Sequence, residues 1–290
     1  MTGTASIGAA SASSDARRNK WLNDADSYVG SYNSSVMLQS SFVENEPLRP
    51  RPQGAGWQQL TVLKAGTFSG SGRTADGAAY TLSGVLWPDG RMPESVLLYV
   101  NQGVLQGLGA LSLGGAAPAF ADNRVTGSLS WLKKGPSATT DKIHKAGFSV
   151  VSVDLDGSKW VKPVPVTSPI VIGLTDKPDN ASVVFTQAGV TSASQYAQLP
   201  TLFRVTTANV AQFPTAGSLA NPCKLGMTIT STTGLFSGSF IIPGATTALN
   251  RTAPFFGQIV RVGLTTQDYN YFLLPTDTAA TAPKLSGSVE

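Results

Sequence analysis

The chain has 290 residues, of which 41% are hydrophobic and only 13% are charged, and its formal net charge at pH 7 is +4. Ordinary soluble domains have about 25% charged residues. In this chain Gly, Ser, Thr, Ala and Pro take the place of many charged residues, a composition that is typical of proteins built from short strands and tight turns. Because this composition is also common in secreted and surface-displayed proteins, we expect an extracellular or cell-surface protein. No apolar run is long enough for a transmembrane helix and no basic cluster reaches the length of a nucleic-acid-binding patch, so we expect no membrane span and no nucleic-acid partner.

Residues 1–24 form an Ala/Ser-rich N-terminal segment without apolar periodicity. Such a segment cannot bury enough surface to offset the entropy that it loses on ordering. We therefore expect it to be flexible, or ordered only against a partner. It also lacks the apolar core of a signal peptide, so export would require that the signal was removed or that the chain is a segment of something longer.

Residues 25–135 are predicted to form a first antiparallel β unit. Short segments in which apolar and polar residues alternate are separated by turns at a spacing of about 8–12 residues, which indicates an antiparallel sandwich or barrel. The pattern predicts seven strands, at residues 28–38, 56–63, 67–73, 78–87, 95–100, 103–113 and 125–132.

Residues 136–146 interrupt this pattern with charged residues and Pro, and they are predicted to be a linker. Residues 147–290 are predicted to form a second antiparallel β unit. Its expected strands lie at residues 148–155, 169–175, 181–187, 201–207, 223–230, 234–242, 252–262, 269–275 and 284–290. No apolar pattern of helical period persists for about twelve residues, so the predicted fold class is all-β.

A short repeat suggests how the two units are related. GTFSGSG at 66–72 returns as GLFSGSF at 234–240, and the strands that follow have the same order in both places. In Phe-x-Gly the two residues share one face of a strand, and the Gly leaves room for a neighbouring aromatic ring. The repeat predicts two similar antiparallel β-barrel or sandwich units from an internal duplication. The alternative is that unrelated hairpins converged on one composition.

Several turn and strand motifs together resemble a known family. They are LTV at 60–62, ADG at 75–77, DG at 89–90, LY at 98–99, GVLQG at 103–107 and GSLSWLK at 127–133, followed in the second half by CKLGMTITSTTGLFSGSF, GQIVR and SGSV. Over residues 28–290 the chain resembles a β-rich module of large exported, immunoglobulin-array-type proteins of Verrucomicrobia and related bacteria. GAGW at 54–57 and YNYFLLP at 269–275 depart from the family pattern. The resemblance implies an exported module, and it carries over no catalytic residue.

The single histidine and the single cysteine do not predict a catalytic site. His144 lies in the predicted linker, and Cys223 lies at the start of a predicted strand. A nucleophilic triad needs a histidine beside its nucleophile, and zinc needs three or four ligands. We therefore predict that the protein is not an enzyme and has no cofactor, and we expect Cys223 to be a half-buried small hydrophobe.

The carboxylates leave two further hypotheses. Asp154 and Asp156, in DLDG, resemble half of a calcium loop, but no acidic ligand follows closely and the same pattern is typical of a hairpin turn, which we favour. A glycoside hydrolase needs two carboxylates facing each other across a cleft. Only Glu94 lies at the edge of a predicted strand, so hydrolysis is a third hypothesis that depends on Glu94.

Aromatic residues suggest a binding function, because flat rings stack on sugars. Most large aromatic residues fill β cores, and this is expected of Trp57, Trp87 and Trp131. Tyr269 and Tyr271 lie on one face of their predicted strand and Phe272 lies on the other. These two tyrosines and Trp160 are the candidate ligand-binding residues.

Taken together, these features predict a non-enzymatic, exported structural or adhesive module. The alternative is a carbohydrate-binding module that uses exposed Trp and Tyr residues. We also expect association with further copies or with neighbouring β modules, because the strand at 284–290 has few charges to protect its edge and residues 1–24 could add to an open edge. The alternative is a floppy tail on a monomer.

Overall fold

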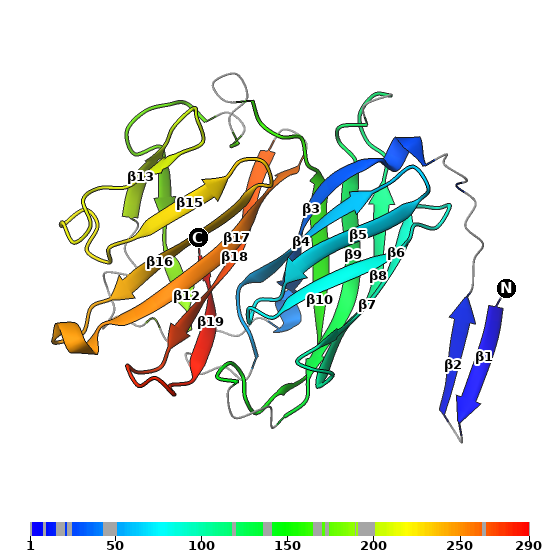
Figure 1. Ribbon diagram of the computed structural model, residues 1–290, viewed down its shortest axis with the longest axis horizontal. Helices are drawn as coiled ribbons and strands as arrows, with labels where there is room; N and C mark the ends of the chain where they lie inside the picture. Colours follow the sequence, from blue (N-terminus) through cyan, green and yellow to red (C-terminus); the bar gives the residue numbers. More distant parts are fainter. Residues whose placement is uncertain are drawn as a thin grey trace.

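The computed structural model describes residues 2–7, 10–15, 21, 25–42, 51–117, 120–135, 141–164, 170–171, 174–188, 190, 201–262 and 265–289. Their regular structure is β-strand apart from short 3-10 turns at η1 (Asp26–Tyr28), η2 (Ser40–Phe42) and η4 (Thr247–Leu249). A nearly closed barrel and a half-barrel lie side by side, and an N-terminal hairpin lies apart from both (Figure 1). The predicted all-β class is confirmed.

Eight antiparallel strands form the barrel, in the order β6-β5-β4-β3-β10-β9-β8-β7. They are β3 (Gly30–Leu38), β4 (Ala55–Val62), β5 (Thr67–Arg73), β6 (Ala79–Val85), β7 (Arg91–Leu98), β8 (Gly103–Ser112), β9 (Arg124–Lys133) and β10 (Phe148–Lys159). The edge strands β6 and β7 lie next to each other, but no ladder joins these two fully described strands, so the barrel has one seam. Every second residue points inward; β7 buries Met92, Glu94, Val96 and Leu98 in this way.

The half-barrel is a six-stranded antiparallel sheet in the order β12-β19-β18-β17-β16-β15. Its strands are β12 (Phe185–Gln187), β15 (Gly226–Thr230), β16 (Leu235–Ile242), β17 (Arg251–Val262), β18 (Thr265–Pro275) and β19 (Lys284–Val289), and a small sheet of β11 (Ala181–Val183), β13 (Thr201–Val205) and β14 (Ala211–Gln212) lies beside it. Its core contains a cluster of phenylalanines in which Phe185 stacks on Phe240 with ring centroids 3.6 Å apart. β18 separates the two cores, because Tyr271 belongs to the barrel cluster and Phe272 to the half-barrel cluster.

The boundary between the units differs from the sequence prediction. β10, expected to begin the second unit, lies in the middle of the barrel sheet between β3 and β9. Residues 141–147 therefore belong to the connection between two neighbouring strands of one sheet. The composition misled the prediction because charge, Pro and Gly mark any exposed loop, whether it joins strands or domains.

The two copies of the Phe-Ser-Gly-Ser repeat occupy similar places. β5 and β16 are each the middle strand of a three-stranded meander, in which Phe68 pairs with Gly84 and Phe236 pairs with Gly257. A Cβ atom added to Gly84 or Gly257 would lie 2.6 or 2.3 Å from the partner ring, so each ring fills the space that a side chain would need. This local match agrees with a duplication, although the two sheets differ in strand number and closure.

The described part of the N-terminal segment contains regular structure. β1 (Thr2–Ile7) and β2 (Ala10–Asp15) form an antiparallel hairpin. Further along, the indole N–H of Trp21 donates to the carbonyl oxygen of Leu86 at 2.7 Å, and its ring meets Tyr28 edge-on. Trp21 therefore holds the end of this segment on the barrel.

Two expectations for the second half need correction. The final strand is not an open edge, because β12 covers β19 and pairs Phe185 with Val289. Sequence could not show this, since the covering strand lies about a hundred residues upstream and pairing between distant strands leaves no local pattern. The strand expected at 169–175 lies partly outside the described residues, and its described residues are not in a strand.

Candidate functional site

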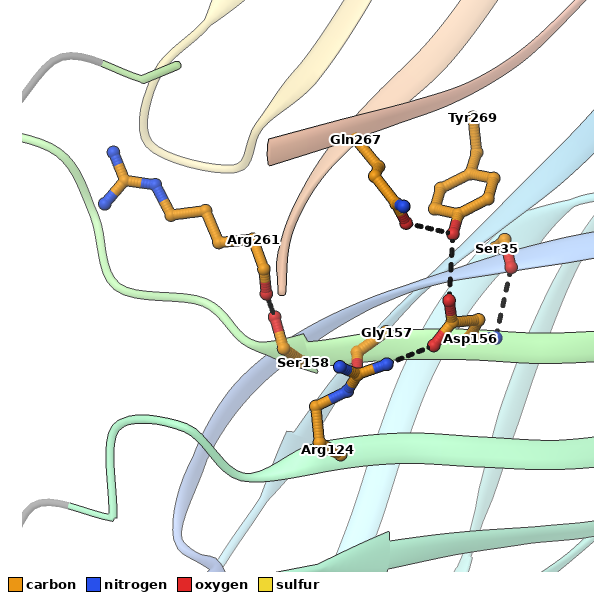
Figure 2. A network of polar contacts seen from close by, with 8 residues as sticks. All are labelled: Ser35, Arg124, Asp156, Gly157, Ser158, Arg261, Gln267 and Tyr269. Atoms are coloured by element: carbon orange, nitrogen blue, oxygen red, sulfur yellow. Dashed lines mark hydrogen bonds and ion pairs between the residues drawn. The ribbon is translucent and has the colours of Figure 1, made fainter. Parts of the chain in front are cut away.

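A polar network joins the barrel to the half-barrel (Figure 2). Asp156 of β10 is at its centre: its carboxylate lies 2.5 Å from the guanidinium of Arg124, and its other oxygen is 3.0 Å from the hydroxyl of Tyr269 on β18. The backbone N–H of Asp156 donates to Ser35 Oγ at 3.1 Å. Burial, and then the charge of Asp156, raise the pKa of the Tyr269 hydroxyl above its ordinary value, so this contact holds a neutral phenol against a carboxylate.

A second set of contacts fastens the loop between β15 and β16 onto the barrel. The side-chain amides of Asn33 and Gln59 both donate to the carbonyl oxygen of Thr233 at 2.8 Å. The indole N–H of Trp160 donates to the carbonyl oxygen of Thr232 at 3.0 Å. Asn33 is almost completely buried, so the loop forms a fixed wall beside the outer surface of β3 and β4.

The outer surface of β3, β4, β5 and β6 is an ordered array of neutral polar side chains, which we call the polar face. It consists of Ser31, Asn33, Gln59, Thr61, Ser69, Ser71, Thr81 and Ser83. The strand register arranges these residues in two rows across the four strands, Ser31–Thr61–Ser69–Ser83 and Asn33–Gln59–Ser71–Thr81. The alternation of the strands produces the rows, because the residues between them, such as Tyr32, Leu60 and Leu82, point into the core.

Two hollows lie over the polar face and meet at Ser71. The first, of about 450 Å³, extends from Ser31 and Gln59 to Thr233 and Trp160, and none of the described residues that line it is charged. The second, of about 540 Å³, lies at the seam of the barrel between β6 and β7 and is lined by Trp57, Thr81 and Leu97. Among the described residues that line the second hollow, Arg73 is the one that is charged. The site is therefore an extended polar surface with two neutral rows of side chains, a tryptophan in each hollow and Arg73 at the second hollow.

The three candidate ligand-binding residues do not come together. Tyr271 is completely buried, Trp160 is 8% exposed with its edge at the first hollow, and Tyr269 is half-buried in the junction network. Tyr269 also lines a separate cavity of about 340 Å³ between the units. Sequence reasoning missed Trp57, which is half-buried at the second hollow rather than inside the barrel. The Ser/Thr alternation over β3–β6 was the signal that could have drawn attention to this surface.

The calcium candidates lie within a strand. The interpretation of DLDG as a turn is wrong, because Asp154 and Asp156 both lie within β10. Asp154 accepts a hydrogen bond from Gln39 at 2.7 Å, and Asp156 is occupied by Arg124 and Tyr269. Among the residues that the structure describes, no group of three or more His, Cys, Asp or Glu side chains could hold a metal ion.

The remaining residues considered for chemistry lie in three different parts of the fold. Glu94 points into the barrel, where Gln58 donates to it at 3.2 Å, and burial raises the pKa of its carboxyl to about 7. His144 lies in the connection before β10, with its ring edge-on to Phe148. Cys223 is buried in the half-barrel core, and burial raises the pKa of its thiol to about 11. A thiol with such a pKa is a poor nucleophile at neutral pH.

Comparisons with protein-family models, with curated proteins and with solved structures found no match. In the described part of the chain, no helix has the length and apolar character needed to cross a membrane.

Proposed function

We propose that this protein is a non-enzymatic structural or adhesive module of an exported protein. The observation that carries the proposal is the junction between the two units. Charged, amide and hydroxyl groups from both units meet there in direct hydrogen bonds, and Asn33 is buried in it. Satisfied networks of this kind rigidify a structure and select one arrangement. A rigid two-unit body that presents a broad polar face suits a protein that has to hold on to a surface.

Low charge, the dense β structure and the resemblance to modules of exported proteins support the same proposal. Proteins that bind through a preorganised surface lose less conformational entropy when they do so. The strands that carry the polar face are fixed by their hydrogen-bonded ladders within the barrel and by the contact of Gln59 with the half-barrel, so their side chains keep a constant spacing.

Retention under flow tests the adhesive function. Beads coated with the full chain would pass over surfaces coated with polysaccharide, with protein or with the chain itself, and the fluid would be analysed for released products. We expect retention on at least one surface with no product. Release of a sugar product that disappears in Glu94→Gln would instead establish the hydrolase hypothesis, and no retention on any surface would reject adhesion.

Self-association is a second part of the proposal. An isolated two-stranded hairpin is only marginally stable in water, and β1 and β2 form such a hairpin. Pairing with a strand edge of another copy would supply the missing hydrogen bonds. The edge of β15 is open in the described sheet, since β15 pairs only with β16.

A further inference from the structure

We propose that the polar face binds a neutral polysaccharide chain, which would lie across β3–β6 from the Trp160 wall to Trp57. The inference deepens the proposed adhesive function by naming the chemistry of the surface that the module holds. It rests on three features of the face: its neutrality, its spacing and its preorganised edge.

The composition of the face selects for a neutral ligand rich in hydroxyl groups. Its six hydroxyl side chains both donate and accept hydrogen bonds and therefore match sugar hydroxyls, while the amides of Asn33 and Gln59 hold the loop at one end of the face. No lysine or arginine lies in either row, so the face lacks the cations that phosphate, sulfate or uronate groups would need. Arg73, at the second hollow, is directed instead toward the Phe256 ring, 5.3 Å from its centroid, and donates to the carbonyl oxygen of Gly77.

The hydroxyl groups of the face are available to a ligand. Ser69, Ser71, Thr81 and Ser83 are exposed, and within the described part of the chain their hydroxyls have no hydrogen-bond partner. Exposed apolar side chains border the face at Leu97 on β7, Val85 on β6 and Leu63 after β4, and none of them lies in either row.

The spacing of the rows suits an extended chain. Neighbouring strands lie about 4.8 Å apart, so four strands span roughly 14 Å, which is about the length of three hexose units. The two hollows share Ser71 and so form one continuous path over this distance. Trp57 in the second hollow supplies an aromatic surface on which a sugar ring can stack.

The far end of the path is fixed before any ligand arrives. Trp160, Asn33 and Gln59 hold the carbonyl oxygens of residues 232 and 233 in place. Because these contacts exist in the free protein, a bound sugar would not have to order the loop, and preorganisation of this kind increases affinity.

Affinity electrophoresis and calorimetry on the full chain test the inference. The probes are soluble neutral polysaccharides (a β-glucan, a xylan, a mannan) and acidic ones (polygalacturonate, heparin). We expect saturable binding to a neutral polysaccharide and none to the acidic ones. Ser71→Glu, which places a charge and extra volume where the hollows meet, should weaken binding by about tenfold or more. Ser95→Glu, an exposed serine on β7 outside both hollows, is the matched control and should bind normally.

Trp57→Phe provides a second variant, which keeps an aromatic ring at this position, and it should weaken binding and reduce the quenching of tryptophan fluorescence by the sugar. The inference is overturned if no neutral polysaccharide binds, if only acidic ones bind, or if Ser71→Glu binds as the unaltered protein does. If no neutral polysaccharide binds but the coated beads are still retained on a protein surface, the adhesive function is supported and only the proposed ligand class is rejected.

Discussion

Replacing Glu94 by Gln should stabilise the protein at neutral pH and leave it unchanged in acid. Glu94 points into the barrel, where Gln58 donates to its carboxyl group and Tyr80 in turn donates to Gln58 at 3.0 Å. Burial penalises the charged carboxylate and raises its pKa from 4.5 to about 7, and the bond from Gln58 only partly opposes this. Each pKa unit corresponds to about 1.4 kcal/mol, so the ionised side chain costs the folded state about 3 kcal/mol.

The sign of the pH dependence follows from linkage. Below pH 4.5 Glu94 is protonated in both the folded and the unfolded chain, and it adds no pH dependence. Between pH 4.5 and about 7 the unfolded chain releases this proton first, so the free energy of unfolding falls as the pH rises. Above about pH 7 the full cost is present. Glu94→Gln removes the ionisation and can still accept the hydrogen bond from Gln58.

Urea denaturation at pH 4 and at pH 8 measures the effect. The variant should match the unaltered protein at pH 4 and exceed its free energy of unfolding at pH 8 by up to about 3 kcal/mol. Asp277→Asn removes an exposed loop carboxylate and is the control for a general change of charge. An equal difference between Glu94→Gln and the unaltered protein at both pH values would refute the reasoning, because the carboxyl group would then not change its proton affinity on folding.

Three further predictions concern packing, the junction and assembly. Gly257→Ala should lower the free energy of unfolding by about 1–3 kcal/mol, because the new methyl group would meet a phenylalanine ring. Gly226→Ala is the control and should not lower it, because nothing lies within 4 Å of the added Cβ. Thermal unfolding compares the two variants. Tyr269→Phe should cost about 1–2 kcal/mol, and a double-mutant cycle with Asp156→Asn should show that the two losses are not additive. Deleting residues 1–20 should convert an associated protein into a monomer, as measured by the mass from light scattering. A monomeric mass for both the full chain and the shortened chain would contradict the self-association hypothesis.

Local sequence was sufficient to predict most strands. All seven strands expected over residues 28–132 are present, because strands such as β6 and β7 bury alternate residues and most of the turns between the strands contain a Gly that is visible in the sequence. Strand alternation also predicted that Tyr271 and Phe272 lie on opposite faces of their strand, but only the tertiary structure showed that each face is buried in a core. The polar face was present in the same pattern, as the outward half of the alternation over β3–β6.

The strand partners were decided only by the tertiary structure. β10 pairs with β3 over a separation of more than a hundred residues, and β12 covers β19 over a similar one. An antiparallel ladder needs only backbone groups and a compatible face, so many strands of one chain could pair equally well as far as local sequence is concerned. The choice among them is made by the side chains that meet when the whole core closes, as Tyr269 meets Asp156 at the junction. The same closure turned rows of unremarkable serines and threonines on separate strands into one continuous surface, which no single stretch of the sequence contains.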